Sequence, residues 1–168
     1  MLRIGKPSAR LAGILVLALT ALVVTETAVL ATTLSKKGGP VTKVKTVTAD
    51  DSPTTTSTSF SNVPGMSISM SVPSGQKALF VVTLSAVSVC YTEGVLCYVR
   101  LLVDNNPAPP GDLIFNSNAS GPGAHSMQFV AGPLSAGTHT VEVQWMVDEV
   151  GATFQMAERT LTVLRSKI

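Results

Sequence analysis

The stretch THTVEVQWMV, residues 138–147, is the clearest guide to the fold. Its apolar residues are Val141, Val143, Trp145 and Val147, and they alternate with Thr140, Glu142 and Gln144. A period of two places these sets on opposite faces of a β-strand. We therefore expect a half-buried strand whose core face includes Val141, Val143 and Trp145.

The same period recurs on both sides of this strand, and no helical period follows residue 31. Phe80 shares the apolar face of a long strand predicted over residues 77–90, so it joins the expected core. Further strands are predicted over residues 66–72, 95–104, 113–115, 125–130 and 154–163. Glycine and proline separate these segments. The pattern predicts an all-β antiparallel sandwich of about seven or eight strands, jelly-roll-like or alternatively immunoglobulin-like.

The last of these strands changes phase partway along. Phe154 and Met156 are even-numbered, whereas Leu161 and Val163 are odd-numbered. One face accepts both pairs only if an extra residue is inserted, so we expect a β-bulge between Ala157 and Thr160.

Charge is scarce and unevenly placed. Charged residues make up 13% of the chain and aromatic residues 5%. The net charge of +2 belongs to residues 1–31, and the rest of the chain is neutral. Nucleic-acid binding needs clustered lysine and arginine. Residues 60–168 show no such run, so no nucleic-acid partner is expected.

Residues 1–31 have the order of a secretory signal peptide. A basic start precedes the apolar run Leu11–Val24, and Val29-Leu30-Ala31 offers small residues for cleavage after Ala31. The run is short for a bilayer span of about 20 residues. The alternative is an uncleaved membrane anchor formed by residues 11–24. A secreted or extracytoplasmic location follows, with membrane anchoring as its alternative.

Residues 32–59 are rich in serine and threonine and predict a tether. Within this tether, the β-branched segment 41–49 is a candidate edge strand. Lys43 and Lys45 on it would oppose pairing with a further strand. The sandwich domain is expected over residues 60–168.

Cys90 and Cys97 are the only cysteines, and each falls on the apolar phase of its own strand. With six residues between them, a hairpin would place them opposite each other. An oxidising compartment then favours a structural disulfide. A redox-active pair is the rival interpretation, although the spacing is not C-x-x-C.

No catalytic or cofactor set is recognisable. His125 and His139 match no zinc motif and are expected to be hydrogen-bonded structural residues. Asp104, Asn106 and Asp112 are weak candidates for a calcium loop. Loop carboxylates at Asp104, Asp112, Asp148 and Glu149 would be needed for a hydrolase. Turn residues of this kind ordinarily bond backbone amides.

A glycosylation sequon is also present in the sequence, at Asn118-Ala119-Ser120.

Several stretches resemble a recurrent group of uncharacterised exported bacterial β-sandwich proteins. These stretches are FSNVPGMSISMSVPSGQKALFVVTLSAVSVC, CYVRLLVD, AHSMQF, LSAGTHTVEVQW and RTLTV. The resemblance covers roughly residues 41–168 and includes the cysteine pair. It implies export and the fold, and it transfers no catalytic residue.

The leading functional hypothesis is an exported, non-enzymatic module without a cofactor that binds a glycan, an envelope component or a protein. One alternative is a structural or assembly subunit of the cell envelope. A second alternative is a hydrolase that uses the loop carboxylates.

Overall fold

The computed structural model describes residues 38–117 and 121–168, within a compact unit that spans Lys36–Ile168. The predicted signal peptide and the sequon lie outside the described residues. The strands are β1 (Val41–Ala49), β2 (Thr54–Thr55), β3 (Ser61–Val72), β4 (Ala78–Cys90), β5 (Cys97–Val103), β6 (Asn106–Pro107), β7 (Leu113–Asn116), β8 (Gly123–Leu134), β9 (Gly137–Val147) and β10 (Phe154–Lys167). No helix in the described part of the chain is long and apolar enough to cross a membrane.

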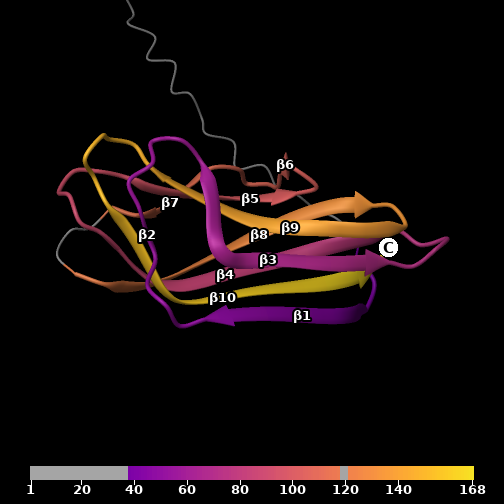
Figure 1. The fold of residues 1–168 in the computed structure, drawn as a ribbon. Helices are drawn as coiled ribbons and strands as arrows, with labels where there is room; N and C mark the ends of the chain where they lie inside the picture. Colours follow the sequence, from indigo (N-terminus) through magenta and orange to yellow (C-terminus); the bar gives the residue numbers. More distant parts are fainter. Residues whose placement is uncertain (1–37, 118–120) are drawn as a thin grey trace, which may run out of the picture. The chain divides into compact units, whose positions relative to one another are not determined.

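The strands form two antiparallel sheets that pack face to face (Figure 1). Sheet A has the order β1-β10-β4-β8, and β2 also pairs with β10. Sheet B has the order β3-β9-β5-β6, and β7 also pairs with β5. The all-β sandwich is confirmed. The first two long strands, β1 and β3, lie in different sheets, which is jelly-roll wrapping and excludes the immunoglobulin-like alternative, whose first two strands are neighbours.

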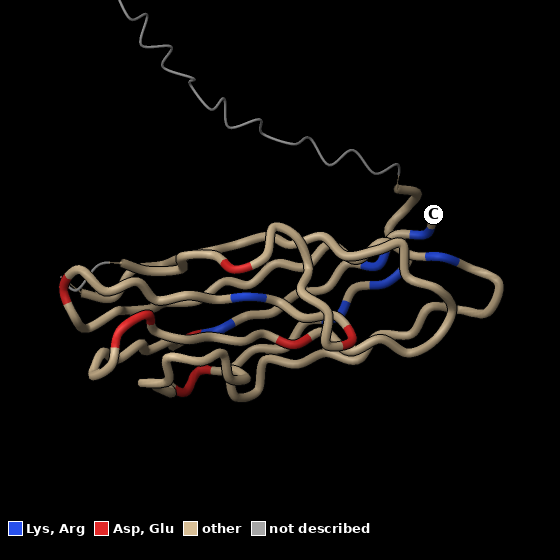
Figure 2. The backbone as a smooth tube through the Cα atoms, turned by 90° about the horizontal axis from the view of Figure 1, so that it is seen from above, with Lys and Arg blue, Asp and Glu red and all other residues tan. Residues whose placement is uncertain are grey.

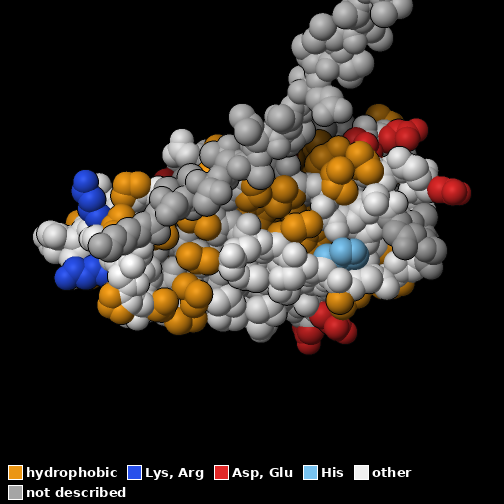
Figure 3. All heavy atoms as spheres, turned by 180° about the vertical axis from the view of Figure 1, so that it is seen from behind, with side chains coloured by type: hydrophobic (Ala, Val, Ile, Leu, Met, Phe, Trp, Pro, Cys, Tyr) orange, Lys and Arg blue, Asp and Glu red, His pale blue; other side chains and the backbone are white. Residues whose placement is uncertain are grey.

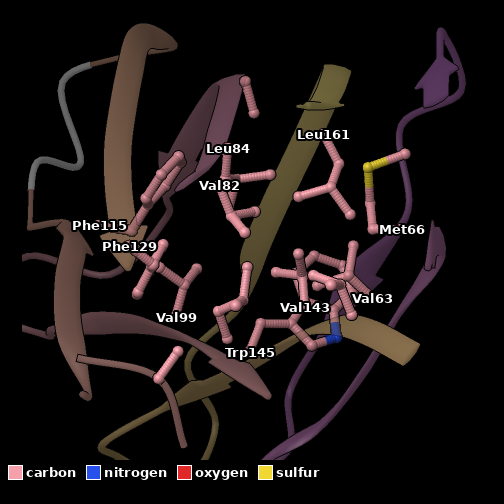
Figure 4. Packing of buried hydrophobic residues seen from close by; sticks show 14 of the residues in the cluster. Val63, Met66, Val82, Leu84, Val99, Phe115, Phe129, Val143, Trp145 and Leu161 are labelled. Carbon is pink, nitrogen blue, oxygen red and sulfur yellow. The ribbon is translucent and has the colours of Figure 1, made fainter. Parts of the chain in front are cut away.

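The core lies between the sheets and is built from the alternating apolar residues of both (Figure 4). Phe80, Val141, Val143 and Trp145 are all buried, with Trp145 only 2% exposed. The Trp145 ring on β9 packs against Phe154 on β10, with ring centroids 5.5 Å apart. This aromatic contact joins the two sheets.

A register shift interrupts β10 between Ala157 and Thr160, as the phase change predicts. Two residues of β10, Glu158 and Arg159, therefore oppose the single residue Ala86 of β4, and Arg159 lies in the interior, where it is 1% exposed. Its Nη1 group donates to the carbonyls of Asp51, at 2.8 Å, and Met156, at 2.7 Å. Its Nη2 group donates to the Asp51 carboxylate at 2.5 Å. The bulge therefore carries a buried cation that holds the segment before β2.

The sandwich begins earlier than residue 60. Residues 41–49 form β1, an edge strand along β10, and residues 54–55 form β2 on the same partner. Both strands lie inside the predicted tether. Serine and threonine content suggests a tether, but threonine and valine also fit a pleated surface well.

The disulfide between Cys90 and Cys97 is confirmed, with a Cα–Cα distance of 5.9 Å. The predicted hairpin is wrong, because Cys90 ends β4 in sheet A and Cys97 begins β5 in sheet B. Cys90 pairs with Phe154 on β10, and Cys97 pairs with Val147 on β9. The bond therefore connects the two sheets and does not fix the register of one hairpin.

Candidate functional site

His139 and Asp104 form an ion pair at the turn between β5 and β6. The Nδ1 group of His139 lies 2.6 Å from Asp104 Oδ2, and Nε2 lies 2.8 Å from the Ser135 carbonyl. Asp104 Oδ1 also accepts the Thr140 amide at 2.9 Å. With both ring nitrogens engaged, His139 is a structural residue and has no nitrogen left for a substrate or a metal.

These contacts shift the pKa values of His139 and Asp104 in opposite directions. Partial burial lowers the pKa of His139, but the bonds to Asp104 and Ser135 and the carboxylate charge outweigh it. The pKa is therefore raised above its ordinary 6.5. Burial raises the pKa of Asp104, but the bonds from His139 and Thr140 and the imidazolium charge outweigh it. That pKa is lowered below 3.8.

The calcium candidates do not form a common set of ligands. The carboxylate of Asp104 bonds His139 and Thr140, and Asn106 donates its side-chain amide to the Asp104 carbonyl at 2.9 Å. Asp112 is exposed in the loop before β7. Within residues 38–117 and 121–168, no three His, Cys, Asp or Glu side chains cluster as a metal site.

The loop carboxylates are also separated. Asp104 follows β5 and Asp148 follows β9, and these strands are antiparallel neighbours. The two residues therefore lie at opposite ends of sheet B. Asp148 Oδ1 accepts a hydrogen bond from the Leu96 amide at 2.9 Å. Acidic residues in turns commonly bond backbone amides in this way.

His125 belongs to a second polar cluster, at the disulfide end of β4. Its Nδ1 lies 3.0 Å from the Ser88 hydroxyl. Asn116 donates to the Ser88 carbonyl at 2.8 Å and to the Ser88 hydroxyl at 3.2 Å. Ser88 is 1% exposed, so its hydroxyl cannot meet a substrate and this cluster is structural.

The outer face of sheet B carries a different arrangement, centred on Arg100. Arg100 on β5 is paired with Gln144 on β9, and Gln144 is paired with Asn62 on β3. The Arg100 Nε group donates to Gln144 Oε1 at 2.8 Å. Gln144 Nε2 then donates to Asn62 Oδ1 at 2.8 Å. This chain of bonds crosses three strands and fixes the guanidinium group.

Phe60 completes the support of the guanidinium. The Arg100 Cζ atom lies 4.0 Å from the centroid of the Phe60 ring, a cation–π contact. The two Nη groups of Arg100 make no hydrogen bond or ion pair with another described residue. Beside them, Tyr98 is paired with Met146 and Ile114, and Ile114 is 46% exposed. We call Phe60, Asn62, Tyr98, Arg100 and Gln144 the Arg100 face.

The outer face of sheet A contrasts with it. Two rows of uncharged polar side chains cross all four long strands of that sheet. One row is Thr46, Thr162, Thr83 and Gln128, and the other is Thr48, Thr160, Ser85 and Ser126. Hydroxyls already bond each other in these rows, as in the 2.9 Å contact of Ser85 with Ser126. Uncharged side chains also dominate the view from behind, with charged ones toward its margins (Figure 3).

The alternation in residues 138–147 places Gln144 on the outer face of its strand, but the sequence alone indicates no role for Gln144, Tyr98 or Arg100. The missing information is the pairing of β5 with β9 and of β9 with β3. One available signal was the scarcity of cations, since Arg100 is the only basic residue between Lys77 and Arg159.

No protein-family model and no curated protein matches the sequence. Among solved structures, the chain is similar to the VP2 subviral particle of infectious bursal disease virus. That match has a TM-score of 0.46 and 11% identity, and it covers 73% of this chain and 32% of that one. Dimeric latent PorU from Porphyromonas gingivalis gives a TM-score of 0.47 and 6% identity over 79% of this chain and 14% of that one.

A third similar structure is the CBM36-1 domain of a multidomain xylanase from the hindgut metagenome of Trinervitermes trinervoides. It gives a TM-score of 0.38 and 14% identity, and the match covers 72% of this chain and 96% of that domain. The chain thus spans a third or less of the two longer proteins. Likenesses this distant carry no argument about function.

Proposed function

We propose that this protein is an exported, non-catalytic β-sandwich module that binds a glycan through the Arg100 face. The observation that supports the proposal is the Arg100 guanidinium, which is fixed by Gln144 and Phe60 while neither Nη group bonds to any other residue that the structure describes. A guanidinium held in this way presents two parallel donors to an acceptor, with little entropy left to lose on binding.

The neighbouring groups suit a sugar carrying a carboxylate. Asn62 and Gln144 are amides that can exchange hydrogen bonds with hydroxyls, and Tyr98 offers an aromatic side chain with a polar tip. The free Nη pair matches a carboxylate in a bidentate geometry. An acidic glycan of the cell envelope therefore fits this face better than a neutral one.

Export is part of the same proposal. The disulfide between Cys90 and Cys97 is the kind of bond that persists in an oxidising compartment. The order of residues 1–31 and the resemblance to exported β-sandwich proteins support the same location.

A glycan array and an envelope pull-down with the exported protein test the proposal. We expect binding to carboxylated glycans, weakened about 10- to 100-fold by Arg100→Ala through the loss of charged hydrogen bonds. Arg100→Lys should also weaken binding, since lysine keeps the positive charge but lacks the two parallel N–H donors of the guanidinium group. Gln128→Ala, on the outer face of sheet A, is the control and should bind normally. Equal binding by Arg100→Ala, or no glycan bound at all, would refute the proposal.

The assembly alternative rests on β1, a nine-residue strand at the edge of sheet A. Pairing of β1 between copies would join two sheets. Lys43 and Lys45 lie on this strand, and lysine on an edge opposes strand addition. The binding proposal is therefore the better supported one.

A further inference from the structure

Five cations gather at the end of the sandwich where β10 ends. Lys43 and Lys45 lie on β1, Arg165 and Lys167 lie on β10, and Lys77 directly precedes β4. Figure 2 shows several blue segments gathered toward the end marked by the C-terminus, with further blue and red segments along the rest of the sandwich.

Strand pairing brings the cations together. Lys43 is directly opposite Arg165, and Lys167 is opposite Ala78, the residue after Lys77. The Ile168 amide also donates to the Lys77 carbonyl at 3.1 Å. Like charges placed directly opposite each other on neighbouring strands are destabilising. The cluster is therefore not explained by stability.

The cations have no acidic partner in the described part of the chain. The ion pairs found there are His139–Asp104 and Arg159–Asp51, and neither includes a member of the cluster. Lys45 donates to the Ser69 carbonyl at 2.6 Å, and Arg165 donates to the Ser71 carbonyl and to Thr42 Oγ1. Lys43, Lys77 and Lys167 have exposed side chains with no hydrogen bond among the described residues. Two cations thus cover the free edge of β3, and three remain available.

We propose that this basic end docks onto an anionic phospholipid surface. Four of the five cations are lysines, which act as mobile point charges suited to a field of many headgroups. They come from three separate segments, an arrangement that suits a field of headgroups better than one small anion. Each basic residue near an anionic bilayer strengthens binding roughly fivefold.

The path of the chain favours a lipid surface over a soluble polymer. The described part begins at this same end, where the Gly39 amide donates to the Lys167 carbonyl at 2.7 Å. The pair Lys36-Lys37 precedes that point in the sequence, after the predicted cleavage site, and adds two positive charges before this end. Docking by this end leaves the Arg100 face, on the outer surface of sheet B, free for its own ligand.

Vesicle co-sedimentation of the exported protein tests the inference. We expect binding to phosphatidylglycerol–phosphatidylcholine vesicles, little binding to pure phosphatidylcholine, and loss of the difference in high salt. The variant Lys43→Gln/Lys77→Gln/Lys167→Gln should bind the anionic vesicles about 100-fold more weakly. It should melt no lower than the wild type, because these three side chains make no hydrogen bond or ion pair with the described residues and the repulsion between Lys43 and Arg165 is relieved.

Arg100→Gln removes one cation from the Arg100 face and is the matched control, which should bind vesicles normally. The inference is overturned if wild-type protein does not prefer anionic vesicles or if the triple variant binds them as well as wild type does. It is also overturned if millimolar inorganic phosphate displaces the protein, because a site for one small anion would then be present.

Discussion

Both ring nitrogens of His139 face acceptors, the Asp104 carboxylate and the Ser135 carbonyl. Only the imidazolium form donates to both at once. The neutral ring must give up one of these bonds, so protonation of His139 and the closed turn support each other. The sequence predicted a hydrogen-bonded structural histidine here, and its partners lie 35 and 4 residues away.

This pair predicts a pH window of stability. The pKa of His139 is raised, so its contribution is complete below 6.5 and disappears as pH rises through the raised value. The pKa of Asp104 is lowered, so its contribution is present above 3.8 and disappears as pH falls through the lowered value. The stabilisation is therefore greatest between these limits.

His139→Gln should consequently lower the free energy of unfolding more at pH 5 than at pH 8, as followed by urea denaturation. Asp104→Asn should flatten the pH dependence in the same way, since it removes the charge that favours the imidazolium. A stability difference between wild type and His139→Gln that is equal at both pH values would contradict this account.

Strand β10 shows which structural features can be predicted from neighbouring residues and which depend on residues far away in the sequence. The phase change between Met156 and Leu161 is a local pattern, and it predicts the bulge correctly. The consequence of the bulge was not predictable, because Asp51 lies 108 residues from Arg159. A charged residue in a strand is normally read as exposed, whereas Arg159 is 1% exposed.

The bulge predicts unequal effects for the two members of the Arg159–Asp51 pair. Arg159→Ala should lower the free energy of unfolding by about 3 kcal/mol, because it leaves the buried Met156 carbonyl and the part-buried Asp51 carbonyl without their donor. Asp51→Asn should cost about 1 kcal/mol or less, since the Asp51 side chain is 63% exposed and asparagine keeps an acceptor oxygen. Chemical denaturation of both variants measures the order. A larger loss for Asp51→Asn would mean that the ion pair, and not the carbonyl contacts, holds the segment.

For the whole molecule, strand positions were predictable and sheet membership was not. The period of two depends on neighbouring residues, so the core face of Val141, Val143 and Trp145 can be read from residues 138–147 alone. Which strands are neighbours depends on contacts between distant segments. The Arg100 face could not be predicted for this reason, because Asn62 and Gln144 are 82 residues apart in the sequence. The same lack of information on strand pairing led to the incorrect prediction of a hairpin at Cys90 and Cys97.

The corrected position of the disulfide changes what its removal should do. The bond closes a short loop between β4 and β5, and closing it stabilises the fold by about 2.5 kcal/mol in the loop-entropy account. Since it joins sheet A to sheet B, its loss should loosen the end of the sandwich near Cys90 while β-sheet pairing elsewhere persists. Binding at the Arg100 face should survive.

The test compares three forms of the protein, produced in an oxidising compartment: wild type, reduced wild type and Cys90→Ala/Cys97→Ala. Non-reducing mass spectrometry should show wild type lighter than its reduced form by two hydrogen atoms. Both cysteine-free and reduced forms should unfold at lower denaturant. The double variant should lose somewhat more, because both sulfur atoms are buried and their removal leaves a small cavity. Hydrogen exchange should rise first at the chain ends of β4 and β5 that flank the loop. Two free thiols in protein from an oxidising compartment, or unchanged stability of the reduced form, would show that the covalent link between the sheets adds nothing to the fold.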